Sequence, residues 1–172
     1  MKERLGKIRM LLLDVDGVMT DGRIIYSSDG TETKAFNVKD GHGLKMMQRA
    51  GIETGIITGR DSTVVTHRAK ELGINILYQG ALDKTIPFKR ILQTFHINAE
   101  EIAYVGDDIV DLPILLQVGF AATVADALPE VKERVDYVAS LGGGKGAVRE
   151  ICDLILKGSD RWNGVAAKYF QH

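Results

Sequence analysis

The hydrophobic pattern of the chain alternates between two kinds of segment. Short runs of consecutive apolar residues predict buried strands, at 8–14, 53–58, 75–78, 101–106, 119–124 and 136–140. Between them, apolar residues recur at helical spacing, which predicts helices at 43–50, 62–72, 84–95, 109–118, 128–134 and 146–156. Apolar strands joined by helices are typical of a parallel sheet covered on both faces. The pattern therefore predicts a Rossmann-like α/β fold.

Residues 22–37 depart from this alternation. Two β-prone segments, 23–27 and 32–37, flank the sequence SSDG. An Asp-Gly pair between such segments favours a tight turn, so we expect a protruding β-hairpin here. Residues 1–157 are expected to form one domain, and 158–172 a C-terminal tail. Trp162 and Phe170 are unusual residues for a disordered end, so the tail is either frayed or reaches a neighbouring active site.

The composition is that of a globular protein and does not by itself indicate a function. Of the 172 residues, 45% are hydrophobic and 26% are charged, and the net charge is -1. This balance is typical of a globular protein and gives no basic field for nucleic acid or for an anionic membrane. The single cysteine, Cys152, excludes an intramolecular disulfide and is expected to be a buried helix residue. With no evident signal peptide or membrane span, we expect a cytoplasmic protein.

Chemically active side chains gather where three predicted strands end. In an open α/β sheet, ligands bind beyond the carboxyl ends of the strands. If the three strands are neighbours, their polar ends meet at one edge of the sheet. These ends carry Asp14 and Asp16, then Thr58, Gly59 and Arg60, then Asp107, Asp108 and Asp111.

Clustered carboxylates repel one another, and a divalent cation resolves the repulsion. A set of oxygen ligands without His or Cys favours Mg²⁺ over zinc. Alternate residues of an extended segment point the same way, so Asp14 and Asp16 could flank one phosphorus atom. One carboxylate could then attack it while the other protonates the departing alcohol. Thr58 could offer its hydroxyl and amide to the phosphoryl oxygens, and Lys84, at a helix start, its charge. Taken singly, each aspartate could instead be a cap or turn residue.

The order of these motifs resembles that of the haloacid dehalogenase superfamily of phosphohydrolases, through DVDGVMT, IITG, Lys84 and VGDDIVD. A closer resemblance is to the 3-deoxy-D-manno-octulosonate 8-phosphate phosphatases. It rests on further segments, namely KAFNVKDGHG, LYQGALDK, VADALPEV, DYVAS and GGGKGAVREICDLIL.

The resemblance implies a role for each candidate residue. Asp14 would be the nucleophile and a Mg²⁺ ligand, and Asp16 the general acid that also binds the metal through its backbone carbonyl. Asp107 would complete the protein ligands of the metal. Thr58 and Lys84 would hold the phosphoryl group. Asp108 and Asp111 would support the site from behind these ligands.

Chain length leaves no room for the cap domain that shields many relatives. Thr58 and Lys84 are separated by 26 positions, which a helix and a strand occupy, and Asp16 is followed only by the hairpin. An open site needs another cover, and a neighbouring subunit could supply it. The resemblance implies a homotetramer in which the hairpins associate.

Some assignments concern the substrate and its neighbourhood. Arg60 is the candidate for the substrate carboxylate, because its guanidinium binds carboxylates in a bidentate manner. Gly59 and Lys39 are further candidate substrate contacts. Gly41 and Gly43 are expected to permit a tight turn and a close backbone approach. Residues 142–146 are expected to form a flexible loop near the mouth of the site, with Lys145 close to the substrate.

Three alternatives to this phosphatase stay open. A sister phosphatase would act on the 9-phosphate of a sialic-acid-type sugar; Arg60 in TGR favours the octulosonate branch. A non-catalytic assembly subunit would keep the fold without the chemistry. A receiver domain phosphorylated on aspartate would share carboxylates, Thr and Lys, but usually lacks an acid at the position of Asp16.

Overall fold

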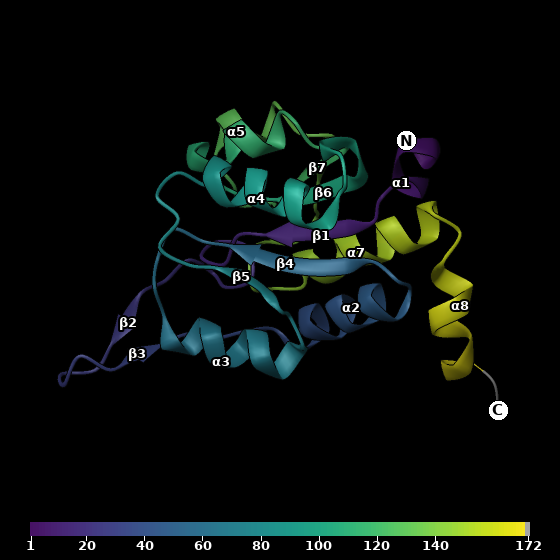
Figure 1. Cartoon of the computed structure of the whole chain (residues 1–172). Coiled ribbons are helices and arrows are strands. Elements are labelled where there is room, and N and C mark those ends of the chain that lie inside the picture. The colour runs from purple at the N-terminus through teal and green to yellow at the C-terminus, as the bar shows by residue number, and fades with distance from the viewer. Residues whose placement is uncertain (171–172) are drawn as a thin grey trace.

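The computed structural model describes residues 1–170, and its centre is a sheet of six parallel strands (Figure 1). The strand order is β5-β4-β1-β6-β7-β8. In this order the strands are β5 (Ile76–Tyr78), β4 (Glu53–Ile57), β1 (Met10–Leu13), β6 (Ile102–Val105), β7 (Phe120–Thr123) and β8 (Tyr137–Val138). The chain reverses direction across the sheet at β1, with β4 on one side and β6 on the other. A crevice opens at such a point beyond the strand ends.

Both faces of the sheet are buried, because successive side chains of a strand point to opposite faces. In β1, Leu11 and Leu13 pack in one core cluster, and Met10 and Leu12 in the other. The first cluster lies under α1 (Lys2–Gly6), α2 (Val38–Arg49), α3 (Thr63–Leu72) and α7 (Ala147–Gly158). The second lies under α4 (Thr85–Phe95), α5 (Leu112–Leu115) and α6 (Pro129–Lys132). The predicted Rossmann-like fold is confirmed.

Helix α2 begins at Val38, well before the predicted start at 43, because Asn37 caps it. The side-chain oxygen of Asn37 accepts a hydrogen bond from the Lys39 amide at 2.8 Å. Gly41 and Gly43 therefore lie inside the helix, and the expected tight turn is wrong. Close backbone approach does occur: a Cβ on Gly43 would lie 3.2 Å from the Cα of Arg149 on α7.

Three further segments differ from the predictions. Residues 109–118 form a short 3₁₀ turn, η2 (Ile109–Asp111), followed by the single turn α5, and residues 128–134 form only α6. Another 3₁₀ turn, η1 (Ala99–Glu101), precedes β6. The C-terminal tail is folded as α8 (Trp162–Ala166) and η3 (Ala167–Tyr169), with Val165 and Ala166 buried against the first cluster. Gln171 and His172 lie outside the described residues.

The hairpin protrudes from the edge of the domain (Figure 1). It consists of β2 (Ile25–Tyr26) and β3 (Glu32–Thr33), which are antiparallel and shorter than predicted. The turn closes through a hydrogen bond from the Ser27 amide to the Thr31 carbonyl, and Gly30 supplies the positive φ of 84°. Two of its apolar side chains are exposed, Ile25 at 46% and Tyr26 at 58%.

The described residues contain no inserted cap. Between Thr58 and Lys84 the chain forms only α3, β5 and connecting loops, as the residue count predicts. Within residues 1–170, no helix has the length and apolar character needed to span a bilayer.

Candidate active site

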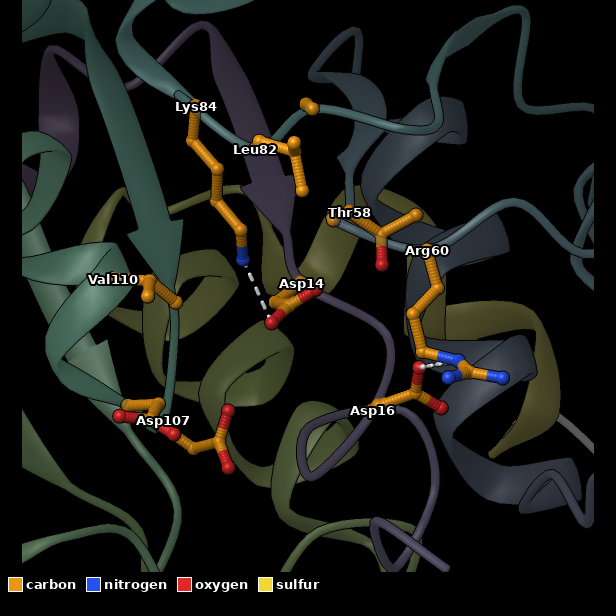
Figure 2. Close-up of a pocket in the computed structure, with 11 residues that line it drawn as sticks. Asp14, Asp16, Thr58, Arg60, Leu82, Lys84, Asp107 and Val110 are labelled. Atoms are coloured by element: carbon orange, nitrogen blue, oxygen red, sulfur yellow. Dashed lines mark ion pairs between the residues drawn. The ribbon is translucent and has the colours of Figure 1, made fainter. Parts of the chain in front are cut away.

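A cavity of about 340 Å³ opens at the carboxyl ends of the central strands. Eight residues singled out from the sequence meet in or beside it, although they come from separate parts of the chain. Figure 2 shows Asp14 turned toward Lys84, and Asp16 turned toward Arg60 on the other side of the opening. The lining residues are Asp14, Asp16, Thr58, Gly59, Arg60, Ala81, Leu82, Lys84, Asp107, Asp108 and Val110.

The Asp14 cluster, which we define as Asp14, Lys84, Asp111 and Tyr104, forms the floor of the cavity. Lys84 Nζ lies 2.7 Å from Asp14 Oδ2 and 2.6 Å from Asp111 Oδ1. All four side chains are buried. Burial alone would lower the pKa of Lys84, but the two carboxylates outweigh it and raise that pKa. Lys84 is therefore a charged ammonium at the bottom of the site.

Asp111 is the structural centre of this cluster. Its Oδ1 also accepts a hydrogen bond from the Tyr104 hydroxyl at 2.7 Å. Its Oδ2 accepts the amides of Asp107 and Asp108, at 3.1 and 3.3 Å. With 0% of its surface exposed and both oxygens engaged, Asp111 lies behind Lys84 and binds the amides of Asp107 and Asp108. Asp108 caps η2 by accepting the Ile109 amide.

Asp14, Asp107 and Asp111 together could hold a divalent cation. One carboxylate oxygen from each lies within 4.8 Å of the others. Asp111 is fully buried and does not line the cavity, whereas Asp14 and Asp107 do, so these two side chains are the ones that can reach a bound ion. A Cβ on Gly17, which has φ of 87°, would lie 2.0 Å from Asp107 Oδ2, so glycine keeps this space for the carboxylate. An all-oxygen set of this kind fits Mg²⁺.

Charge crowding at this point is strong. Burial, followed by the charges of Asp14, Asp111 and Asp108, raises the pKa of Asp107 to about 7. Burial also raises the pKa of Asp14, with Lys84 offsetting part of the effect. A cation bound between the two carboxylates would relieve this repulsion.

Asp16 reaches the cavity by a different route from the expected one. Strand β1 ends at Leu13, and residues 15–20 form bends and turns in which the Val15 carbonyl accepts the amides of Val18, Met19 and Thr20. The expectation that Asp14 and Asp16 share an extended segment is therefore wrong. Both carboxylates line the cavity because the chain curls around its rim.

The glycine-rich segment 142–146 braces these turns. The Gly144 amide donates to the Val18 carbonyl at 3.0 Å, and a Cβ on Gly143 would lie 1.9 Å from the Gly17 carbonyl oxygen. The segment therefore lies beside the turns that carry Asp16, without lining the active-site cavity itself. Lys145 and Lys39 instead line a second cavity, beside α7, so the structure does not bring Lys39 to the cluster of aspartates.

The Asp16 cluster, which we define as Asp16, Lys34, Glu32 and Arg60, joins the site to the hairpin. Lys34 Nζ lies 2.5 Å from Asp16 Oδ1 and 3.3 Å from Glu32 Oε1. Arg60 Nε lies 3.7 Å from Asp16 Oδ2, and its Nη2 donates to Glu32 at 3.3 Å. The guanidinium also donates to the Tyr26 hydroxyl at 2.8 Å. Arg60 thus lines the cavity while being tied to the hairpin.

Thr58 and Gly59 lie at the end of β4 and line the cavity. The Thr58 amide donates to the Tyr78 carbonyl at 2.9 Å. The expectation that this amide is offered to a phosphoryl oxygen is therefore wrong. The hydroxyl is the group that Thr58 can offer.

Sequence reasoning missed three members of these clusters. Tyr104 is one more residue of an apolar strand, and Lys34 and Glu32 lie in a segment expected only to form a hairpin. Residues 32–34 are Glu, Thr and Lys, a polar sequence that is typical of any exposed strand. Only the folding of the hairpin against the rim reveals their partners.

The fold and site define a hydrolase of the haloacid dehalogenase-like family, to which the chain belongs. Residues 30–119 match that family. The 3-deoxy-D-manno-octulosonate 8-phosphate phosphatase KdsC of Yersinia pestis is 46% identical over 162 residues, covering 94% of this chain and 87% of the relative. The KdsC of Escherichia coli K12 is 50% identical over 149 residues, covering 87% of this chain and 79% of the relative.

A solved structure of similar sequence shows the same fold. It is the 3-deoxy-D-manno-octulosonate 8-phosphate phosphatase from Moraxella catarrhalis, in complex with a magnesium ion, a phosphate ion and a KDO molecule. Its TM-score is 0.95 at 41% identity, with 98% of this chain and 97% of that chain covered. Within the haloacid dehalogenase-like hydrolases, the resemblance to the octulosonate phosphatases found in the motifs is confirmed.

Proposed function

We propose that this protein is a Mg²⁺-dependent phosphatase that hydrolyses 3-deoxy-D-manno-octulosonate 8-phosphate to the free sugar acid and inorganic phosphate. The observation that carries the chemistry is the buried ion-pair cluster in which Lys84 contacts both Asp14 and Asp111, with Asp107 alongside. The assignment of the substrate rests on the similarity to KdsC over most of the chain.

In the first step, an Asp14 carboxylate oxygen attacks phosphorus, and the bond from phosphorus to the C8 oxygen of the sugar breaks. Asp16 gives its proton to that departing oxygen. The products are an aspartyl-phosphate on Asp14 and the free sugar acid. Lys84 and the Thr58 hydroxyl bind phosphoryl oxygens and compensate their charge.

In the second step, Asp16 acts as the base. It takes a proton from a water molecule that attacks the aspartyl-phosphate, which releases inorganic phosphate and restores the Asp14 carboxylate. Asp111 holds Lys84 in place and contacts no substrate, because it is buried behind Lys84. Asp14 and Asp107 would hold Mg²⁺ by their side chains and Asp16 by its backbone carbonyl. When bound, the ion supplies Lewis-acid stabilisation of the phosphoryl charge.

Arg60 is the group proposed to bind the carboxylate of the sugar acid. It lines the cavity near Asp16, and its side chain is 40% exposed, so a ligand can reach it. Its Nη2 already donates to Glu32 and Tyr26, so the substrate would bind the other guanidinium nitrogens or displace one of these contacts. No contact in the structure supports a substrate role for Lys39.

The assembly proposed for this protein is a cytoplasmic homotetramer. Exposed apolar residues stand at the rim of the site and on the hairpin, including Leu82 at 91% and Ile25 at 46%. Burial of such a surface against a second subunit would be favourable and would cover the site. Light scattering of the purified protein tests the tetramer, and cell fractionation tests the compartment.

A phosphate-release assay with Mg²⁺ tests the function. The substrates are the octulosonate 8-phosphate, a sialic-acid-type sugar 9-phosphate and a sugar phosphate without a carboxylate, such as ribose 5-phosphate. We expect the highest kcat/KM on the first. Preference for the 9-phosphate would reassign the substrate. No turnover on any of the three substrates would support the alternative of a non-catalytic assembly subunit. Asp14→Asn is the control for contaminating phosphatases.

A further inference from the structure

Lys34 is a buried lysine outside the motifs that carry the chemistry. Its side chain is 1% exposed, although it follows β3 of an otherwise solvent-exposed hairpin. Its ammonium contacts Asp16 Oδ1 at 2.5 Å and Glu32 Oε1 at 3.3 Å. Burial of an ammonium is costly unless it is paired, so the two carboxylates explain why Lys34 is tolerated there.

Asp16 is held by fewer groups than Asp111. It lies in a loop of turns, where the backbone after β1 no longer runs as a strand. Within residues 1–170, the polar contacts of its carboxylate come from Lys34 and Arg60. Asp111, by comparison, accepts hydrogen bonds from two side chains and two amides.

The two cations beside Asp16 differ in distance and in exposure. Lys34 is in contact and fully buried, whereas Arg60 lies 3.7 Å away with 40% of its side chain exposed. Figure 2 shows the Arg60 guanidinium beside the Asp16 carboxylate. Arg60 can therefore move toward a ligand while Lys34 stays in place, further secured by Glu32, which itself accepts a hydrogen bond from the Ser62 hydroxyl.

We propose that Lys34 is the positioning residue for the general acid: its contact with Oδ1 holds the Asp16 carboxyl against rotation and leaves Oδ2 for proton transfer. This rests on the proposed function. As the Asp14 oxygen bonds to phosphorus and the bond from phosphorus to the sugar oxygen breaks, the Asp16 proton passes to that oxygen. A freely rotating carboxyl would donate it less often.

The leaving group provides the test. The alkoxide of a sugar needs a proton to depart, whereas p-nitrophenolate departs without one. We expect Lys34→Met to lower kcat/KM on the octulosonate 8-phosphate about 10²-fold and on p-nitrophenyl phosphate less than about 3-fold. kcat/KM is the quantity to compare, because it covers the steps up to leaving-group departure. Lys70→Met, an exposed lysine on α3, is the matched control and is expected to change neither value.

A double-mutant cycle separates positioning from a general structural effect. In an Asp16→Asn background, Lys34→Met should lower activity by less than about 2-fold, since Lys34 acts through the Asp16 carboxyl. The proposal would be overturned if Lys34→Met lost activity equally on both substrates or lost none. It would also be overturned if the activity losses of Lys34→Met and Asp16→Asn multiplied fully in the double variant.

Two further arms keep the test decisive. If Lys34→Met leaves Glu32 with too little positive charge beside it and fails to fold, the pair Lys34→Met with Glu32→Gln removes both charges and should show the same selective loss. A crystal structure of the folded variant should show the Asp16 carboxyl rotated from its place beside the hairpin, independently of activity. A wild-type enzyme that rejects the octulosonate 8-phosphate would refute the proposed substrate alone; an unmoved Asp16 carboxyl would refute the role of Lys34.

Discussion

The two clusters at the active site are built differently although they line the same cavity. The Asp14 cluster stands at the ends of β1 and β6 and the start of α4, and its side chains are all buried. The Asp16 cluster combines a loop of turns with an exposed hairpin, and one of its cations is 40% exposed. The first is set by the packed sheet, and the second joins the turns after β1 to the protruding hairpin.

This difference matches the two tasks of a phosphatase. The nucleophile, the metal and the phosphoryl group require fixed charges, which a buried and fully bonded cluster supplies without reorganisation. In the second cluster, the exposed Arg60 can change its contacts when a sugar acid enters or leaves, while the buried Lys34 keeps its contact with Asp16. Four changes would break or sharpen the comparison, from the largest expected effect to the smallest.

Asp14→Asn should abolish turnover, with kcat lowered by about 10⁴-fold or more, because the nucleophile is gone. The same variant should unfold at an equal or higher temperature than the wild type. Burial raises the pKa of Asp14, so a neutral side chain is easier to bury there, and Lys84 keeps Asp111 as a partner. Calorimetry without metal checks this; a strong loss of stability would mean that the ion pair to Asp14 holds the fold.

Asp111→Ala should destabilise the protein by about 3–5 kcal/mol, because it leaves Lys84 and the Tyr104 hydroxyl buried without this partner. Asp108→Ala is the matched control on the same loop and should cost about 1 kcal/mol, the value of a lost cap. Urea unfolding measures both. Equal losses would show that Asp111 is no more central to the structure than its neighbour.

Arg60→Ala should raise KM for the octulosonate 8-phosphate about 10-fold, with a smaller change in kcat, because a contact to the substrate carboxylate is lost. For ribose 5-phosphate, which has no carboxylate, KM should change less than about 2-fold. Steady-state kinetics with both substrates checks the prediction. Similar increases in KM for both substrates would mean that Arg60 contacts the phosphoryl group or only stabilises the hairpin.

Magnesium should stabilise the protein more at pH 8 than at pH 6. Folding raises the pKa of Asp107 from its ordinary 3.8 to about 7. The metal-free fold therefore loses stability as the pH rises from about 4 to about 7, where the unfolded chain has already released this proton. Mg²⁺ requires the ionised carboxylate, and binding at pH 6 must first remove the proton.

We expect the Mg²⁺-induced increase in Tm to be about 2–4 °C larger at pH 8, which corresponds to roughly 1 kcal/mol for a chain of this size. Asp107→Asn should remove this pH dependence. An increase that is independent of pH in the wild type would exclude Asp107 from the metal site.

Much of the molecule followed from the sequence alone. Continuous apolar runs between amphipathic segments predict a sheet buried on both faces, since few folds can bury such strands. Asp14, Asp107 and Lys84 were identifiable because strand ends in a parallel sheet share one edge, whatever the details of packing. The count of residues between Thr58 and Lys84 excluded a cap in the same way.

Other features were decided by tertiary structure. Asn37 extends α2 over two glycines, and the turns after Asp14 place Asp16 on the rim instead of on a strand. The contact between Lys34 and Asp16 joins residues 18 positions apart, and no local pattern encodes it. Hydrophobic periodicity reports which face of an element is buried, but the partner of a buried charge depends on how separate elements meet in space.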